Sequence, residues 1–151
     1  MSRLLLSVSL LGFAAACAPA PSTNDTSPVL SYTDAFVTEP IGDRDVTSGG
    51  VTLSVAGGDV ALTGASSPSF DAIELHTMSM SDGQMQMRMV EKFDIADGEN
   101  LELTRDGNHL MMFGIKEGVV SGETVDITLN FEAGGETMNL VIEADVRALG
   151  E

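Results

Sequence analysis

Residues 72–90 read AIELHTMSMSDGQMQMRMV, and this stretch decides the fold class. The dipeptide Asp82-Gly83 stands between two segments, 72–80 and 84–90, of strand-like length. Asp-Gly in that position is the usual sequence of a two-residue turn that joins antiparallel strands. The stretch is the clearest hairpin signal in the chain, and it predicts β structure.

Short segments of the same kind recur on both sides of the hairpin, separated by glycine-rich turns at 57–58, 106–108 and 134–135. Aromatic residues are few, Trp is absent, and no segment has the pattern of a strong amphipathic helix. Strands at this spacing predict one all-β domain over residues 30–151, a sandwich or a barrel. Besides the hairpin we expect a loop at 64–68 and strands at 30–37, 51–55, 60–63, 101–104, 109–115, 125–131 and 138–144.

The N-terminus has the pattern of an export signal. A basic start is followed by an apolar run over residues 4–16, which is too short to cross a bilayer as a helix. Three alanines then precede Cys17, which resembles a bacterial lipoprotein signal. We expect residues 1–16 to be a signal peptide, Cys17 to carry a lipid, and residues 17–29 to be a flexible tether. The alternative is an ordinary secretory leader in which Cys17 has no role.

The net charge of −16 excludes some partners. The chain has no basic patch, so the phosphate backbone of nucleic acid would be repelled. Anionic lipid headgroups would be repelled too, and membrane attachment would therefore be covalent. We interpret the acidity itself as a device for solubility.

The chemical anomaly is a cluster of methionines around the only two histidines. Seven of the nine methionines lie between residues 78 and 112. Since strand side chains alternate between faces, the Asp82-Gly83 turn places six residues on one face of the hairpin. His76 and Met87 are diagonal neighbours there, and His109 and Met111 share a face of a third segment. The six hairpin residues are His76, Met78, Met80, Met85, Met87 and Met89.

Two imidazoles and two thioethers form a donor set for Cu(I). Thioether sulfur is soft and uncharged, so the set suits Cu(I) and matches Zn poorly. An exported thiol would be easily oxidised, whereas methionine holds Cu(I) without that liability and releases it more readily. The alternative is that the methionines fill the core. Either this second interpretation or a position just behind the ligands applies to some of the other methionines, which are Met78, Met80, Met85, Met89, Met112 and Met138. Of these, Met112 should face opposite to Met111 and is a candidate for the core.

The spacing His76-x10-Met87-x21-His109-x-Met111 resembles the signature of the periplasmic PCu(A)C copper chaperones. The resemblance covers about residues 30–146. It implies a cupredoxin-like Greek-key β-barrel that binds one Cu(I) through these four residues at an exposed end. It also implies copper supply to the binuclear centre of cytochrome c oxidase, often alongside a Sco-type protein. Further matching words are GASSP at 64–68, ELHTM at 74–78, MQMR at 85–88, HLMMFGIK at 109–116 and LNFE at 129–132.

Some features depart from that family, and other functions stay open. Residues 49–51 lack the aromatic often found there, and residues 146–151 hold no His or Met, so we expect no second C-terminal copper site. We expect a periplasmic monomer that is not an enzyme, since the domain has no Cys for thiol–disulfide chemistry. The rival interpretations are a copper buffer or resistance protein with the same site, and an adhesive or scaffolding β-lipoprotein that binds no metal.

Overall fold

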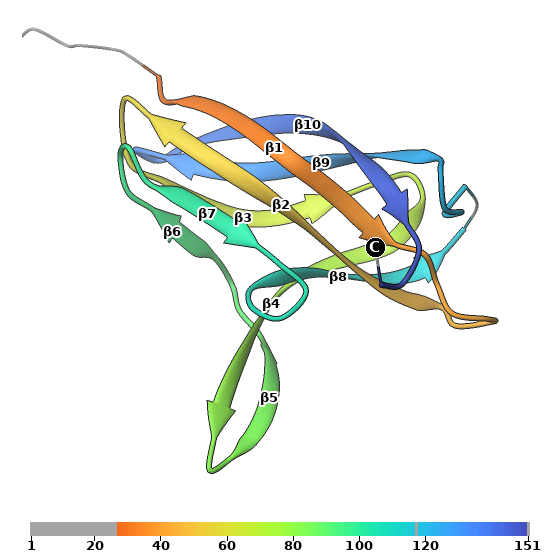
Figure 1. Ribbon diagram of the computed structural model, residues 1–151. Coiled ribbons are helices and arrows are strands. Elements are labelled where there is room, and N and C mark those ends of the chain that lie inside the picture. The colour runs from red at the N-terminus through yellow and green to blue at the C-terminus, as the bar shows by residue number, and fades with distance from the viewer. Residues whose placement is uncertain (1–26, 117, 151) are drawn as a thin grey trace, which may run out of the picture.

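The computed structural model describes residues 27–116 and 118–150, which form strands joined by turns (Figure 1). Within these residues no helix could cross a membrane. The predicted signal peptide, Cys17 and most of the predicted tether lie outside the described residues. The all-β prediction is confirmed. The strands are β1 (Val29–Thr38), β2 (Val46–Ala56), β3 (Val60–Ser66), β4 (Phe70–Ser81), β5 (Gln84–Met89), β6 (Phe93–Ile95), β7 (Asn100–Leu103), β8 (His109–Ile115), β9 (Thr124–Ala133) and β10 (Glu136–Arg147).

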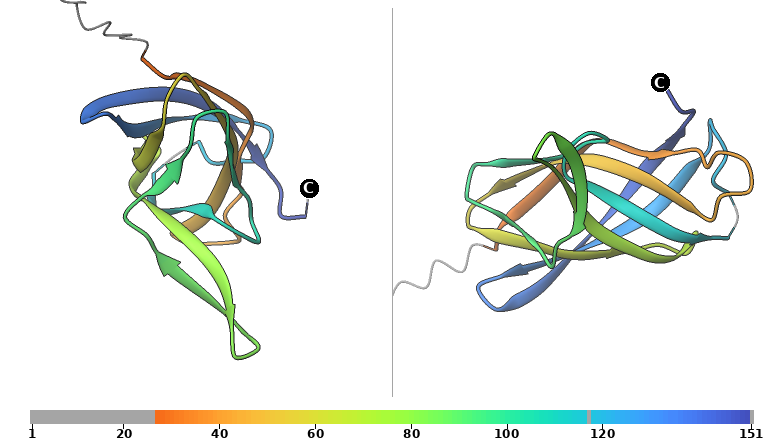
Figure 2. Two further views of the ribbon diagram at one scale, coloured as in Figure 1. Left: turned by 90° about the vertical axis from the view of Figure 1, so that its left-hand side faces the viewer. Right: turned by 90° about the horizontal axis from the view of Figure 1, so that it is seen from below.

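Seven strands close into a barrel in the order β4-β8-β2-β1-β10-β9-β3 (Figure 2). The seam between β3 and β4 is short and is made where Ala65 lies opposite Ile73. Among the described strands, β1 and β10 form the parallel pair, with Phe36 opposite Asp145, and the other pairs are antiparallel. A barrel is one of the two architectures that the strand spacing predicted, and it is the one that the family resemblance implied.

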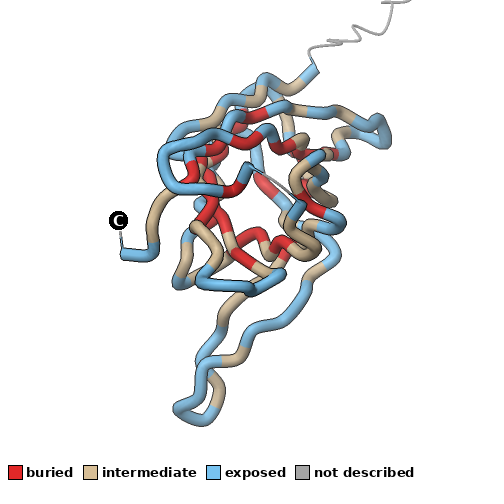
Figure 3. The backbone as a smooth tube through the Cα atoms, turned by 90° about the vertical axis from the view of Figure 1, so that its right-hand side faces the viewer, coloured by how far each residue is buried: buried red, intermediate tan, exposed pale blue. Residues whose placement is uncertain are grey.

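The core lies inside the barrel because apolar and polar residues alternate along its strands. On β9 the side chains of Val125, Ile127, Leu129 and Phe131 are buried, and the residues between them are more exposed. In Figure 3 the buried positions gather on the strands that surround the interior of the barrel. Met112 of β8 is fully buried among them, so its assignment to the core is confirmed.

Strand β2 is longer than the predicted segment 51–55, because its first half pairs with β8 and its second half with β7. The change of partner falls at Gly49-Gly50, directly before the segment that was predicted as a strand. A Cβ atom on Gly50 would collide with the carbonyl oxygen of Leu103 and approach the Phe36 ring at 2.8 Å. Glycine at this position therefore allows three strands to meet closely.

Two further features, both involving β3, differ from the sequence-based expectation. The predicted loop at 64–68 is wrong in its first half, since β3 continues to Ser66 after a bulge between Leu62 and Gly64. The residues after the bulge pair with β9, and this long-range pairing outweighs the local turn signal. The short strand β6 was not predicted; it forms by pairing with the start of β3.

The β4–β5 hairpin has the predicted register, with Met80 opposite Met85 and Met78 opposite Met87. Asp82 and Gly83 have φ angles of 52° and 77°, the left-handed values that a type I′ turn requires. Residues Phe70–His76 of β4 pair with β8, whereas the rest of β4 pairs with β5. The hairpin consequently extends beyond the barrel (Figure 1).

Candidate functional site

The two histidines face each other on neighbouring strands. His76 of β4 lies opposite His109 of β8, and their ring centroids are 5.8 Å apart. His76 also lies opposite Met89 of β5, so it stands where the barrel meets the protruding hairpin. Met111 lies two residues beyond His109, and Met87 lies diagonally across the hairpin from His76. The third segment that the sequence required for this constellation is therefore β8.

His109 is held with one nitrogen available to a ligand. Its side chain is buried, with a residue exposure of 2%, and Nδ1 lies 2.9 Å from the carbonyl oxygen of Gly107. Because a carbonyl oxygen can only accept, Nδ1 carries the proton and donates it. Neutral His109 then has its lone pair on Nε2.

His76 is held in the complementary way. Its Nε2 lies 2.8 Å from Oε2 of Glu74, and its side chain is 13% exposed. Since the carboxylate accepts, Nε2 carries the proton, and neutral His76 then has its lone pair on Nδ1. That Nδ1 is buried and has no hydrogen-bond partner. An unsatisfied buried acceptor costs about 1–3 kcal/mol, and a bound cation would remove that cost.

A pocket of about 210 Å³ brings together three of the four predicted ligands: Met87, His109 and Met111. His76 is not part of this lining, and its ring packs against His109 instead. Met87 is 46% exposed, so the pocket grades from a buried imidazole to a thioether open to solvent. The other lining residues come from the β1–β2 connection and two further segments: Thr38, Glu39, Pro40, Ile41, Arg44, Val46, Thr47, Ser48, Arg105 and Leu149.

Sequence reasoning did not find the groups that orient the two rings. Glu74 precedes His76 by two residues, so strand alternation places both on one face and could have indicated the contact. The carbonyl of Gly107 could not be foreseen, since its direction depends on the Asp106-Gly107 turn. Arg105 was also missed; its Nη2 donates to Oγ1 of Thr38 at 3.2 Å, and its Nε is buried without a partner.

The methionines outside the predicted ligand set differ in burial, and Met78, on the hairpin, is half-buried. Met112 and Met138 pack in or against the core, as the filler interpretation predicted. Met80, Met85 and Met89 are 57–69% exposed, and for them that interpretation is wrong. Packing therefore accounts for few of the methionines near the histidines.

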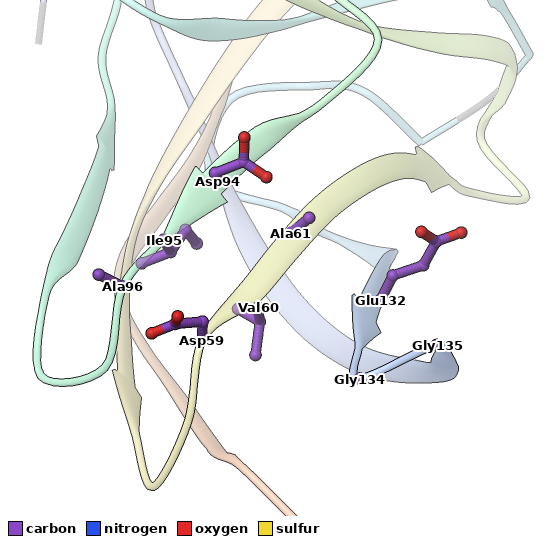
Figure 4. Close-up of a pocket in the computed structure, with 9 residues that line it drawn as sticks. All are labelled: Asp59, Val60, Ala61, Asp94, Ile95, Ala96, Glu132, Gly134 and Gly135. Carbon is purple, nitrogen blue, oxygen red and sulfur yellow. The ribbon is translucent and has the colours of Figure 1, made fainter.

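A second pocket, of about 410 Å³, contains none of the predicted site residues. It lies between the start of β3, β6 and the β9–β10 turn. Figure 4 shows that its three carboxylates, on Asp59, Asp94 and Glu132, are spread apart and do not converge on one point. Over residues 27–116 and 118–150, no group of three His, Cys, Asp or Glu side chains is placed to hold a metal ion. The thioether-containing constellation is thus the better candidate for chemistry.

Several solved structures share this fold, among them the following two. The copper-bound PCuAC domain from PmoF2 superposes with a TM-score of 0.65 at 15% identity, over 79% of this chain and 92% of that domain. The solution structure of CuI-DR1885 from Deinococcus radiodurans has a TM-score of 0.61 at 33% identity, over 78% of this chain and 77% of that one. Both likenesses confirm the cupredoxin-like architecture, and the resemblance to PCuAC domains is confirmed with them.

Comparison of this sequence with known proteins identifies the family of the chain. The protein "Putative lipoprotein Lxx21020" from Leifsonia xyli subsp. xyli is 30% identical over 86 residues, which are 56% of this chain and 52% of that protein. The chain thus matches about half the length of this curated relative. The family model described as "Putative lipoprotein LpqE-like" matches residues 30–142, which includes the whole candidate site. The chain belongs to the LpqE-like family, and its barrel has the architecture of PCuAC domains.

Proposed function

We propose that this protein is a copper chaperone that binds one Cu(I) ion through His76, Met87, His109 and Met111. One observation carries the proposal: two opposed imidazoles each have one nitrogen oriented by a hydrogen bond and the other left with a lone pair. Hydrogen-bond partners of this kind are typical of metal-binding histidines, because they fix the tautomer and the ring orientation.

The donor set supports Cu(I) over other metals. Met87 and Met111 line the pocket with His109, and thioethers are ligands for soft cations. In the described part of the chain no three His, Cys, Asp or Glu side chains are placed to hold a metal ion, which are the residues that form a Zn site. The solved structures of CuI-DR1885 and of the copper-bound PmoF2 domain support the same assignment.

The difference in exposure between the ligands suits transfer of the copper ion to another protein. His109 is buried, whereas Met87 is 46% exposed on the protruding hairpin. A recipient could displace the outer thioether first and take the ion by stepwise ligand exchange. Copper would keep its oxidation state throughout, so transfer would need no redox partner.

The site of action that we propose is outside the cytoplasm, at a membrane to which Cys17 attaches the protein through a lipid. The lipoprotein relatives support this location. As recipient we propose the binuclear copper centre of cytochrome c oxidase, reached directly or through a Sco-type protein. A protein that buffers copper would use the same site, so the recipient must be tested separately.

The binding test is an anaerobic Cu(I) titration against a competing chelator. Met111→Leu and Met87→Leu remove the sulfur and keep the apolar bulk, and Met112→Leu makes the same change at a buried neighbour outside the pocket. We expect one tight equivalent in the native protein and in Met112→Leu, and much weaker binding in the other two variants. Equal affinity in all four proteins would overturn the assignment.

The transfer test mixes the copper-loaded protein with the soluble apo form of the oxidase domain that carries the binuclear centre. Appearance of the copper absorption bands of that domain would support delivery. Tight binding without any transfer, to that domain or to a Sco-type protein, would favour the buffer.

A further inference from the structure

The outer part of the hairpin uses methionine in place of every other large apolar residue. Residues 77–89 read TMSMSDGQMQMRM, which holds five methionines and no Leu, Ile, Val or Phe. A strand that needed only apolar surface would accept β-branched residues, which are favoured in strands. The sequence therefore selects sulfur at these positions.

The outermost of these side chains are in solvent. Met80 is 69% exposed and Met85 is 57% exposed, while Met78 is half-buried. In Figure 3 the corresponding part of the tube is exposed or intermediate, with no buried position, and stands clear of the buried core. Met80 and Met85 do not contribute to the core, so packing in the folded state does not explain why methionine stands at these positions.

The register connects the outer thioethers to the candidate site. Met80 lies opposite Met85 on the last rung before Ser81, and Met78 lies opposite Met87 on the next methionine rung inward. Residues that face each other across antiparallel strands have Cβ atoms about 4.5–5.5 Å apart, and those two positions along share the same face. The result is a continuous strip of thioethers from the hairpin tip to Met87, which lines the pocket.

We infer that Met78, Met80 and Met85 form a second, outer Cu(I) site, from which the ion moves inward through Met87. This inference rests on the proposed function. Cu(I) accepts low coordination numbers and soft ligands, and the segment offers little to harder cations, since Asp82 is its only carboxylate. Along the strip each step exchanges one thioether for another, and on entry to the inner site imidazoles replace thioethers, with no change in oxidation state at any step. Because it lacks imidazole, the outer site binds more weakly than the inner one.

The test measures Cu(I) uptake by the full-length protein, with the ion supplied anaerobically as its bicinchoninate complex. The double variant Met80→Leu/Met85→Leu removes two sulfurs and keeps the apolar surface. Met89→Leu removes a sulfur from the same hairpin at an exposed position outside the outer site, and serves as the control. The ¹³C shifts of the methionine methyl groups identify which side chains take up the ion.

We expect the native protein and Met89→Leu to take up a tight and a weaker equivalent, with the Met80 and Met85 methyl signals moving during the second. The double variant should keep the first equivalent and lose the second. A single equivalent in the native protein would overturn the outer site and leave the chaperone proposal intact. A second equivalent that survives in the double variant would also overturn it. Failure of the native protein to take up any Cu(I) would overturn both proposals.

Discussion

His76 and His109 lie directly opposite each other on β4 and β8, with ring centroids 5.8 Å apart. The backbone register sets this separation, and hydrogen bonds to Glu74 and Gly107 set the orientation of the rings. Little side-chain freedom remains to be lost on binding an ion. Preorganisation of this kind raises affinity by reducing the entropic cost of binding.

Glu74 should raise copper affinity through its contact with His76. Replacing Glu74 by Ala frees the imidazole to rotate and to change tautomer, and loss of such a partner commonly weakens metal affinity about 10–100-fold. Glu74→Gln keeps an oxygen that can accept, so its loss should be smaller. Glu102→Ala, a change at an exposed carboxylate on β7, is the control. Chelator competition gives the affinities, and no difference between Glu74→Ala and Glu102→Ala would contradict the positioning role.

The hairpin turn should determine the local stability of β5 without affecting the stability of the barrel. Gly83 has φ +77° and open space around its Cβ position, so Gly83→Ala changes backbone energy alone. The left-handed conformation costs a residue with a Cβ about 1–2 kcal/mol. Because β5 pairs with β4 alone, the cost should appear as local opening.

Hydrogen exchange measures that opening. The amides of β5 should exchange about 5–30-fold faster in Gly83→Ala, while core amides of β9 keep their native rates. Gly122→Ala makes a comparable change at a distant turn, with φ +90° and open space, and should leave β5 unaffected. Uniformly faster exchange throughout Gly83→Ala would show that the hairpin is part of the global folding unit.

Buried and exposed methionines should differ sharply in their contribution to stability. Met112 is fully buried, so Met112→Ala leaves a cavity and should lower the free energy of unfolding by about 2–5 kcal/mol. Met85 is 57% exposed, and Met85→Ala should change the free energy of unfolding by no more than about 0.5 kcal/mol. Denaturant titration separates the two. A loss at Met85 as large as that at Met112 would mean that the hairpin packs against something in solution.

Local rules were enough to predict the hairpin. A two-residue Asp82-Gly83 turn fixes every pair that follows it, and strand alternation then assigns each side chain to a face. The same reasoning placed His109 and Met111 together and Met112 in the core. These predictions need only residues that are close in sequence and the alternation of side chains along a strand.

Long-range pairing explains what the sequence left undetermined. That β8 is the strand beside β4 depends on barrel closure, which no local pattern encodes. The extension of β2 through Gly49-Gly50 and the short strand β6 are likewise stabilised by partners far along the chain. The exposure of Met80 and Met85 follows from how far β4 runs past the end of β8, a length set by the tertiary structure.

Copper loading should stabilise the fold by mass action. An ion that binds the native state alone adds about 2.7 kcal/mol when its free concentration is a hundred times Kd. The unfolded chain separates His76 from His109 and would bind Cu(I) weakly, so the sign of the effect is an increase in Tm. Anaerobic thermal scans should show this increase with Cu(I), and a strong chelator should reverse it. The increase should be much smaller in Met111→Leu and close to native in Met112→Leu. An equal increase in both variants would place the stabilising ion somewhere other than the pocket beside His109.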